Sequence, residues 1–226
     1  MSWENFFIHH EELCGSLSPL QKSDLQQYYQ ELISWNEKLN LTRILSLEDS
    51  LLKHFLDSSL LLFQWQEKFP GEVPVSYLDF GTGGGVPGVV LWHYFHKAPD
   101  LHLMDARNKK LLAIHSMFES QGWRPPSLHH LNLKPGKAKS FVRNLGFKFD
   151  LVSARAVAKT EVLLETLLPL TKKCLLLPKG PGLEQQEWDN AVELSSRKGF
   201  QAVRQERSIT FEGQKIHRNL LCFLKN

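Results

Sequence analysis

Hydrophobic side chains in the first third of the chain recur at the spacing of an α-helix. One apolar stripe follows Ser18 and Pro19, which supply a cap and a proline at the first helical position. It contains Leu25, Tyr28, Tyr29, Leu32, Ile33, Trp35 and Leu39. A second stripe follows the cap Ser46 and contains Leu52, Phe55, Leu56, Leu60 and Phe63. These patterns predict a helical extension over residues 1–70, closed by the turn residues Pro70 and Gly71.

From residue 71 onward the pattern changes to short apolar runs separated by helical segments. The runs predict strands at residues 75–80, 101–105, 127–131, 150–153, 173–178, 202–209 and 219–224. Helices are predicted from residue 87 and over residues 109–121, 137–145, 162–168 and 184–199. This alternation indicates an open α/β sheet over residues 71–226, with parallel central strands and an antiparallel C-terminal hairpin. In such sheets the ligand lies beyond the carboxyl ends of the strands.

Composition narrows the class of protein. The chain has 226 residues, of which 42% are hydrophobic and 23% charged, as expected for a globular protein. The longest apolar stretch, residues 162–177, is interrupted by charges and a proline, so no membrane span of about 20 apolar residues is predicted. The first residues lack the basic start of a signal peptide, and the three cysteines form no CxxC pair. We therefore expect a cytoplasmic protein without disulfide bonds.

The net charge of +3 conceals an asymmetry. Residues 1–78 contain 5 Lys and Arg against 11 Asp and Glu, whereas residues 79–226 contain 22 against 13. A basic run stands out within the second part: Arg124, Lys134, Lys137, Lys139, Arg143, Lys148, Arg155 and Lys159. This run predicts a surface for a polyanion such as RNA, although an ordinary solvated surface would give the same composition.

A glycine-rich turn carries the strongest chemical signal. Residues 79–88 read Asp-Phe-Gly-Thr-Gly-Gly-Gly-Val-Pro-Gly, between a predicted strand and a predicted helix. Glycines allow a tight turn and a close approach of a nucleotide to the backbone. The spacing of Gly83, Gly85 and Gly88 also matches a dinucleotide site, but no P-loop motif occurs. Asp79 before the glycines favours S-adenosylmethionine, whose ammonium group a carboxylate can attract.

Asp105 ends the second predicted strand, about 24 residues after the first glycine. An acid at this position accepts hydrogen bonds from ribose hydroxyls in several nucleotide-binding folds. Together with the glycine turn, Asp105 predicts a ribose contact.

Several motifs together resemble one family. Besides the glycine turn, they are Asn40-Leu41-Thr42, His54-x-x-Asp57-Ser58, Asp105 with Lys109-Lys110, Arg155-Ala156-Val157-Ala158 and Lys179-Gly180. Their order resembles that in the bacterial 16S rRNA guanine-N7 methyltransferases of the RsmG family, also called glucose-inhibited division protein B. The resemblance covers residue 20 to the C-terminus. It implies a seven-stranded class I methyltransferase fold, S-adenosylmethionine as methyl donor, and guanine N7 of small-subunit rRNA as acceptor.

The resemblance also assigns residues to the site. Cofactor-binding candidates are Asp79, Gly81, Gly83, Gly85, Val86, Asp105, Asn132, Leu133 and Arg155. Asn132 and Leu133 stand where the family has an Ala-Glu-like pair, and Pro178 stands where a Met-like residue is expected. Substrate-side candidates are Arg155, Lys179, Asn40 and His54. No general base is expected, because guanine N7 carries a free lone pair.

Some side chains on this list have structural alternatives. Arg155 could pair with a helical carboxylate instead of pointing towards RNA. His54 and Asp57 lie three residues apart on one predicted helix, so they can touch and dock the extension. Adjacent residues of the doublets His9-His10 and His129-His130 point apart, no cysteine or acidic cluster joins them, and no metal site is expected.

Other functions remain open on sequence grounds. The first alternative is a methyltransferase of the same fold that acts on another RNA or on a small molecule. A nicotinamide-dependent oxidoreductase and a non-catalytic RNA-binding protein would also suit parts of the pattern. The expected partner is 16S rRNA in the small ribosomal subunit, and the expected state is a monomer without membrane contact.

Overall fold

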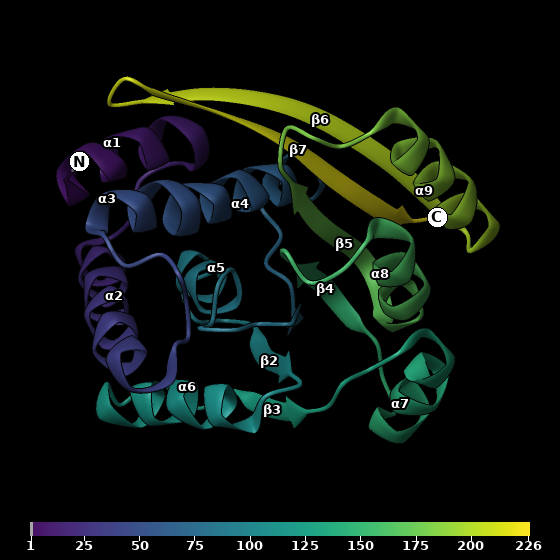
Figure 1. Cartoon of the computed structure of the whole chain (residues 1–226), viewed down its shortest axis with the longest axis horizontal. Helices are drawn as coiled ribbons and strands as arrows, with labels where there is room; N and C mark the ends of the chain where they lie inside the picture. Colours follow the sequence, from purple (N-terminus) through teal and green to yellow (C-terminus); the bar gives the residue numbers. More distant parts are fainter. Residues whose placement is uncertain (1) are drawn as a thin grey trace.

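The strands form one seven-stranded sheet in the order β3-β2-β1-β4-β5-β7-β6, seen in the computed structural model of residues 2–226 (Figure 1). They are β1 (Ser76–Phe80), β2 (Asp100–Asp105), β3 (Ser127–His130), β4 (Phe149–Ala154), β5 (Thr171–Lys179), β6 (Phe200–Phe211) and β7 (Gln214–Lys225). The first five are parallel, and β7 runs antiparallel to both of its neighbours. The strand order reverses between β1 and β4, so a crevice is expected at their carboxyl ends. The predicted fold class is confirmed.

Helices surround the sheet. They are α1 (Trp3–Cys14), α2 (Pro19–Leu39), α3 (Leu47–Ser50), α4 (Asp57–Lys68), α5 (Gly88–Tyr94), α6 (Asn108–Ser120), α7 (Ala138–Leu145), α8 (Thr160–Leu167) and α9 (Gln185–Arg197). A π-helical turn, Leu51–Leu56, joins α3 to α4 without a break. The predicted cap of α2 is confirmed: Ser18 Oγ accepts the Gln21 N–H at 3.2 Å, and Gln21 Oε1 accepts the Ser18 N–H at 3.0 Å.

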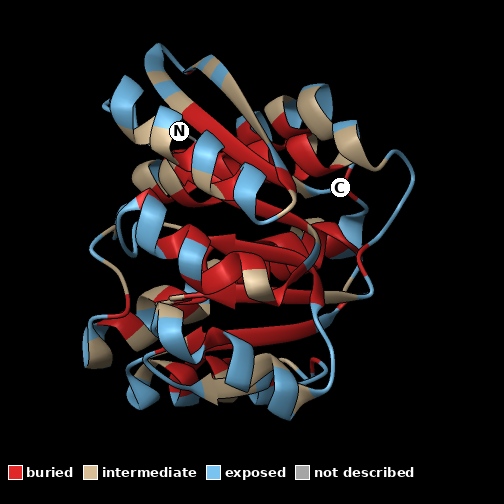
Figure 2. Cartoon of the chain, turned by 90° about the vertical axis from the view of Figure 1, so that its right-hand side faces the viewer, coloured by how far each residue is buried: buried red, intermediate tan, exposed pale blue. Residues whose placement is uncertain are grey.

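The sheet buries a different set of side chains on each face, as the two-residue period of a strand requires. Tyr77 of β1 contributes to a hydrophobic cluster with α4, α5 and α6, whereas Leu78 contributes to a second cluster with α7, α8 and α9. Figure 2 shows the buried strands between helices whose outer faces are exposed. Both faces are therefore covered, as in other largely parallel sheets.

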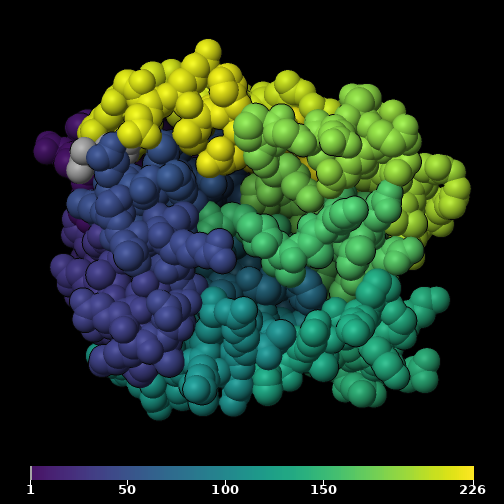
Figure 3. Space-filling view, in the orientation of Figure 1, coloured from purple at the N-terminus to yellow at the C-terminus, as the bar shows by residue number. Residues whose placement is uncertain are grey.

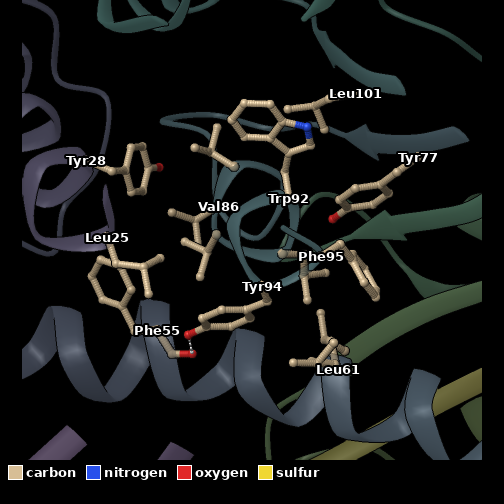
Figure 4. Packing of buried hydrophobic residues seen from close by; sticks show 14 of the residues in the cluster. Leu25, Tyr28, Phe55, Leu61, Tyr77, Val86, Trp92, Tyr94, Phe95 and Leu101 are labelled. Atoms are coloured by element: carbon tan, nitrogen blue, oxygen red, sulfur yellow. Dashed lines mark hydrogen bonds between the residues drawn. The ribbon is translucent and has the colours of Figure 1, made fainter. Parts of the chain in front are cut away.

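The N-terminal helices share the first of these clusters with the sheet. Figure 4 shows Leu25 and Tyr28 beside α5, with Phe55 beneath Tyr94. Tyr94 Oη donates to the carbonyl of Phe55 at 3.1 Å, and Gln21 Nε2 donates to the carbonyl of His93 at 2.9 Å. The helical part therefore packs on the sheet through a continuous apolar core. The boundary near residue 70 stays a prediction.

The C-terminal hairpin is longer than predicted. Strands β6 and β7 each span 12 residues, and their tip lies beside α1 (Figure 1). Phe211 near the tip is fully buried, with its ring centroid 4.9 Å from that of His9. Contact with α1 extends both strands beyond the predicted ends.

Within residues 2–226, none of the helices combines the length and the apolar character that a membrane crossing requires.

Candidate cofactor and substrate site

The glycine turn connects β1 to α5 at the centre of the sheet. The N–H groups of Gly81 and Thr82 both donate to the carbonyl of Met104, at 2.8 and 3.0 Å. Gly81, Gly83 and Gly85 have φ values of 70°, 59° and 101°. Side chains other than glycine rarely adopt these values, which explains the run of glycines.

Four glycines of the turn leave too little room for a Cβ, which would crowd Val157 at Gly81 and Leu32 at Gly84. A Cβ at Gly85 would lie 2.9 Å from Tyr28 Oη, and one at Gly88 would lie 2.7 Å from Asp79 Oδ2. By contrast, no atom lies within 3.9 Å of a Cβ built at Gly83. Gly83 is therefore explained by its positive φ, because a Cβ there would make only ordinary contacts, whereas Gly85 and Gly88 let α2 and β1 come close to the turn.

A cavity of about 530 Å³ opens on one side of the turn. Figure 3 shows it as a hollow where the N-terminal helices, drawn in blue, face the green segments around residues 155–180. It is lined by Leu32, Leu41, Thr42, Ile44, Lys53, His54, Asp57, Gly81, Thr82, Gly83, Gly84, Val86, Ala154, Arg155, Ala156, Ala158, Leu163, Pro178, Lys179, Gly180 and Arg218. We call it the substrate cavity; it brings the extension and the carboxyl ends of β1, β4 and β5 together.

A second cavity, of about 370 Å³, lies on the other side of the turn. It is lined by Phe80, Gly81, Gly83, Met104, Asp105, Ala106, Arg107, Lys110, Leu131, Asn132, Ala156 and Val157. We call it the Asp105 cavity. Asp105 Oδ2 accepts the Gly83 N–H at 2.9 Å, and Oδ1 accepts the Arg107 N–H at 2.8 Å. The two cavities share Gly81, Gly83 and Ala156, so they meet across the glycine turn.

Asp79 lies beneath the turn. Its carboxylate is fully buried and accepts the Gly88 N–H at 3.0 Å and the Ser153 hydroxyl at 2.8 Å. It holds the start of α5 and lines neither of these two cavities. The structure thus places Asp79 in support of the turn, and the predicted attraction of a cofactor ammonium group gains no geometric support.

Arg155 follows β4 and points towards the extension. Its guanidinium donates to the carbonyl of Lys53 and, at 3.0 Å, to His54 Nδ1, and lies 3.8 Å from Asp57 Oδ2. Arg155 thus has the helical carboxylate partner that the sequence left open as an alternative, and its contact with RNA stays a prediction. A largely buried guanidinium requires acceptors, and the helical segment around residue 54 supplies them.

The same network fixes His54 and Asp57. Because His54 Nδ1 accepts from Arg155, its Nε2 carries the proton and donates to Thr42 Oγ1 at 3.2 Å. Burial and the nearby Arg155 charge lower the pKa of His54 to about 3, so the ring is neutral. Asp57 Oδ1 accepts from Arg218 Nε at 2.8 Å. His54 and Asp57 thus both contact Arg155, and Arg218 from β7 completes a four-residue network.

The predicted site residues fall into two groups. Gly81, Gly83, Val86, His54, Arg155 and Lys179 line the substrate cavity, and Asp105 and Asn132 line the Asp105 cavity. Asn40 instead ends α2 in the left-handed conformation, and Leu133 is only 5% exposed in the core. The cofactor contacts themselves stay predictions.

Several residues of the substrate cavity were not predicted, and two of them belong to the polar network around Arg155 and His54. Arg218 comes from the last strand, far along the sequence from every motif, and no local pattern marks it. Thr42 belongs to a quoted motif, but only the fold shows that its hydroxyl meets His54.

Lys179 is paired in the structure. Its Nζ lies 3.2 Å from Glu187 Oε1 on α9, and its side chain is 21% exposed. Hydrogen bonds from Thr160 and Lys179 lower the pKa of Glu187. Lys179 therefore reaches the cavity as one half of an ion pair.

The predicted basic surface is split between two edges of the sheet. Lys134 and Lys159 follow β3 and β4, at the carboxyl edge. Arg124 precedes β3 and binds Asp100 at the start of β2 at 2.9 Å, and Lys148 precedes β4. Because parallel strands share one direction, these residues lie at the opposite edge. The predicted surface therefore does not form one continuous face beside the cavities.

The histidine doublets do not converge. His129 Nε2 lies 3.0 Å from His102 Nδ1, whereas His130 Nε2 lies 3.2 Å from the carbonyl of Ala106. Over residues 2–226, no group of three or more His, Cys, Asp or Glu side chains is arranged to hold a metal ion.

Comparison with solved structures shows the same fold. An O-methyltransferase from Bacillus cereus in complex with SAH matches with a TM-score of 0.60 and 14% identity, over 99% of this chain and 100% of that one. The magnesium protoporphyrin IX methyltransferase of Synechocystis PCC 6803 with bound SAM matches with a TM-score of 0.58 and 14% identity, over 88% and 97%.

Relatives of higher identity share one name, Ribosomal RNA small subunit methyltransferase G. The protein from Lactobacillus delbrueckii subsp. bulgaricus is 35% identical over 91% of this chain and 83% of its own length. The protein from Lachnoclostridium phytofermentans is also 35% identical, with the same coverage. The family model described as rRNA small subunit methyltransferase G matches residues 21–212. The glycine turn, its two cavities and this match together show that the chain belongs to the GidB family, the rRNA small subunit methyltransferases G.

Proposed function

We propose that this chain transfers the methyl group of S-adenosylmethionine to N7 of a guanine in 16S rRNA. Family membership supports the reaction class and the small-subunit rRNA substrate. One geometric observation carries the assignment: the Asp105 cavity and the substrate cavity meet at Gly81, Gly83 and Ala156. A ligand that spans the turn can therefore be held on one side and react on the other.

The residues of the Asp105 cavity fit the nucleoside part of S-adenosylmethionine. Asp105 is partly exposed, and its two oxygens each have a lone pair left to accept from a ribose hydroxyl. Leu131 and Asn132 line the cavity where the base of the nucleoside would lie. Gly83 lines both cavities, so the cofactor would pass beside it towards the substrate cavity. When bound, the cofactor supplies an electrophilic methyl group on a positively charged sulfur.

The proposed reaction requires no proton transfer. The N7 lone pair forms a bond to the methyl carbon while the carbon–sulfur bond breaks, and the sulfur leaves as a neutral thioether. The guanine becomes positively charged and loses no proton in this step. Catalysis then depends on positioning and electrostatics.

The surroundings of His54 agree with a reaction that needs no general base. Its ring is neutral, with a pKa of about 3, and both ring nitrogens are engaged, by Arg155 and Thr42. We infer that His54 positions Arg155 and Thr42 at the cavity wall and does not act as a base. The proposed phosphate contacts are Lys53, in the π-helical turn between α3 and α4, and Lys179, at the end of β5; both line the same cavity.

We further propose that the enzyme acts as a monomer on small subunits in the cytoplasm, where ribosomes are located. Lys134 and Lys159, which follow β3 and β4 at the carboxyl edge of the sheet, are proposed to contact the RNA near the cavities.

The test is methyl transfer from labelled S-adenosylmethionine to 30S subunits that lack the modification. We expect label in 16S rRNA and none in subunits that already carry it. Label that enters only a small molecule would support another methyltransferase, and a complete lack of transfer would support a non-catalytic RNA-binding protein. Tighter binding of NAD than of S-adenosylmethionine in calorimetry would instead indicate an oxidoreductase.

A further inference from the structure

A lysine-lined pocket lies at the edge of the sheet opposite the substrate cavity. Its volume is about 340 Å³, and its apolar lining consists of Val142, Leu168, Pro169 and Phe200. Four lysines complete it: Lys139 on α7, Lys148 before β4, Lys198 after α9 and Lys225 at the end of β7. We call it the lysine pocket.

The four lysines are exposed around one pocket and lack acidic partners. Among residues 2–226, none of them has an Asp or Glu oxygen within 4.0 Å of its Nζ. Lys225 Nζ donates to the carbonyl of Gly199 at 2.9 Å and lies 5.0 Å from the centre of the Phe200 ring.

Other lysines at the same edge of the sheet are neutralised. Lys172 lies 3.1 Å from Asp150 Oδ1, and Lys173 lies 2.6 Å from Glu72 Oε2. The contrast sets the lysine pocket apart from an ordinary basic surface, because like charges gathered around a concave site attract an anion.

The direction of β4 fixes the position of this pocket. Lys148 precedes β4 and Arg155 follows it, so the two sites lie at opposite ends of a six-residue strand. At a rise of about 3.3 Å per residue, roughly 20 Å separates them. The elements that carry these lysines, α7, α9 and the end of β7, lie on the right-hand side of Figure 1, the side that Figure 2 turns towards the viewer.

We propose that the lysine pocket binds phosphate groups of a second segment of the rRNA substrate, while the guanine enters the substrate cavity at the opposite edge. This inference rests on the proposed function. A folded RNA carries phosphates over distances well beyond 20 Å, and a concave pocket with an apolar floor suits a sugar–phosphate unit. A membrane surface fits less well, because Leu168 and Phe200 are buried and offer no side chain for insertion.

The test compares two double variants with the same change in charge. Lys148→Gln with Lys198→Gln removes two charges of the pocket, and Lys38→Gln with Lys173→Gln removes two charges elsewhere. The affinity for unmethylated 30S subunits is measured between about 50 and 200 mM salt. For the pocket variant, we expect the slope of log affinity against log salt to fall by about 1.4–1.8, since each lost phosphate contact contributes about 0.7–0.9.

The pocket variant should keep the affinity for S-adenosylmethionine and the turnover at saturating subunits, which also shows that it folds. An unchanged slope, or an equal change in the control variant, would overturn the proposal. So would loss of binding to phosphatidylserine vesicles without a change towards subunits, because the pocket would then serve a membrane. The proposed function has its own test: it fails if the wild-type protein methylates no subunits at all. The salt dependence of binding, compared between the two variants, tests the lysine pocket separately.

Discussion

At the scale of single residues, Asp105 is the side chain whose removal should affect the cofactor most directly. It holds the N–H groups of Gly83 and Arg107 and has free lone pairs facing its cavity. Asp105→Ala should weaken S-adenosylmethionine binding by about 1–3 kcal/mol, which is roughly 5- to 150-fold in Kd. Isothermal titration calorimetry measures this change.

Asp100 provides the control on the same strand. It lies at the opposite end of β2, where it pairs with Arg124 at 2.9 Å. Asp100→Ala should leave the cofactor affinity unchanged. Equal affinities for the wild type and the Asp105→Ala variant would show that Asp105 does not contact the ribose.

His93 should make the stability of the protein depend on pH. His93 belongs to α5, and its fully buried ring lies 3.7 Å from Asp24 Oδ2 on α2. Burial together with the charge of Lys97 lowers the pKa of His93 to about 3. The unfolded chain takes up this proton near pH 6.5, whereas the folded chain does not. Above pH 6.5 neither state binds the proton, and the contribution of His93 to the free energy of unfolding is fully present. This contribution is lost as the pH falls from 6.5 towards 3, because only the unfolded chain then gains the proton.

In the variant His93→Gln, the unfolded chain no longer takes up this proton. The free energy of unfolding from urea titrations between about pH 6 and pH 4 should then change less steeply, by up to about 1.4 kcal/mol per pH unit. A slope equal to that of the wild type would mean that His93 is charged in the folded protein.

Side-chain direction limited what the sequence could predict about the site. The glycine turn and Asp105 lie where the motifs indicated, because a strand followed by glycines fixes the backbone locally. Asp79 is different: it shares the face of β1 with Tyr77, and this face lies under α5. Arg155 turns towards a helix about 100 residues earlier in the chain, and no local pattern reports such a contact.

At the scale of elements, the glycine turn depends on its contact with α2. Tyr28 Oη donates to the carbonyl of Gly84 at 2.7 Å, and Gly85 makes room for it. Gly85→Ala adds a Cβ only 2.8 Å from Val89 Cγ2, at a φ of 101°. We expect a loss of about 2–4 kcal/mol in the free energy of unfolding.

The variant Gly122→Ala is the control for Gly85→Ala, because it measures the loss of stability caused by backbone strain alone. Gly122 also has a positive φ, 62°, but nothing lies within 4 Å of its Cβ position. Its replacement should cost about 1 kcal/mol. Equal losses for the two variants, measured by urea unfolding, would mean that close packing at the turn contributes little.

The helical segment around Asp57 is docked by buried charges. Asp57 accepts from Arg218 at 2.8 Å and lies 3.8 Å from Arg155, and all three side chains are less than 20% exposed. Asp57→Asn leaves two guanidinium groups without their counter-charge and should cost about 3–5 kcal/mol of stability.

Asp49 offers the matched control, because it lies on α3 and pairs with Lys53 in solvent. Asp49→Asn should cause little measurable change, since exposed ion pairs contribute little. If thermal unfolding showed similar losses for both variants, the buried network would not be what docks this segment.

Most elements could be predicted from their apolar patterns, and two features could not. The π-helical turn Leu51–Leu56 spans six residues, too few to distinguish its period from that of an α-helix. The ends of β6 and β7 depend on contact between their tip and α1, at the other end of the chain. In both cases tertiary packing sets the local structure.

At the scale of the whole molecule, charge is distributed between two edges of one sheet. The basic run is continuous in sequence, but residues before and after a strand of this sheet lie about 20 Å apart. Lys148 and Lys159 on either side of β4 are an example. A net charge therefore predicts a polyanionic partner better than it predicts where that partner binds.

The central claim is that the protein methylates guanine N7 in small-subunit rRNA, with the cofactor and the guanine bound in the two cavities beside the glycine turn. Mass spectrometry of 16S rRNA from cells with and without the gene tests this claim most directly. We predict one 7-methylguanosine in the first sample and an unmodified guanine at the same position in the second, restored by the wild-type gene but reduced with Asp105→Ala. Identical 16S rRNA modification in the two samples would contradict the account.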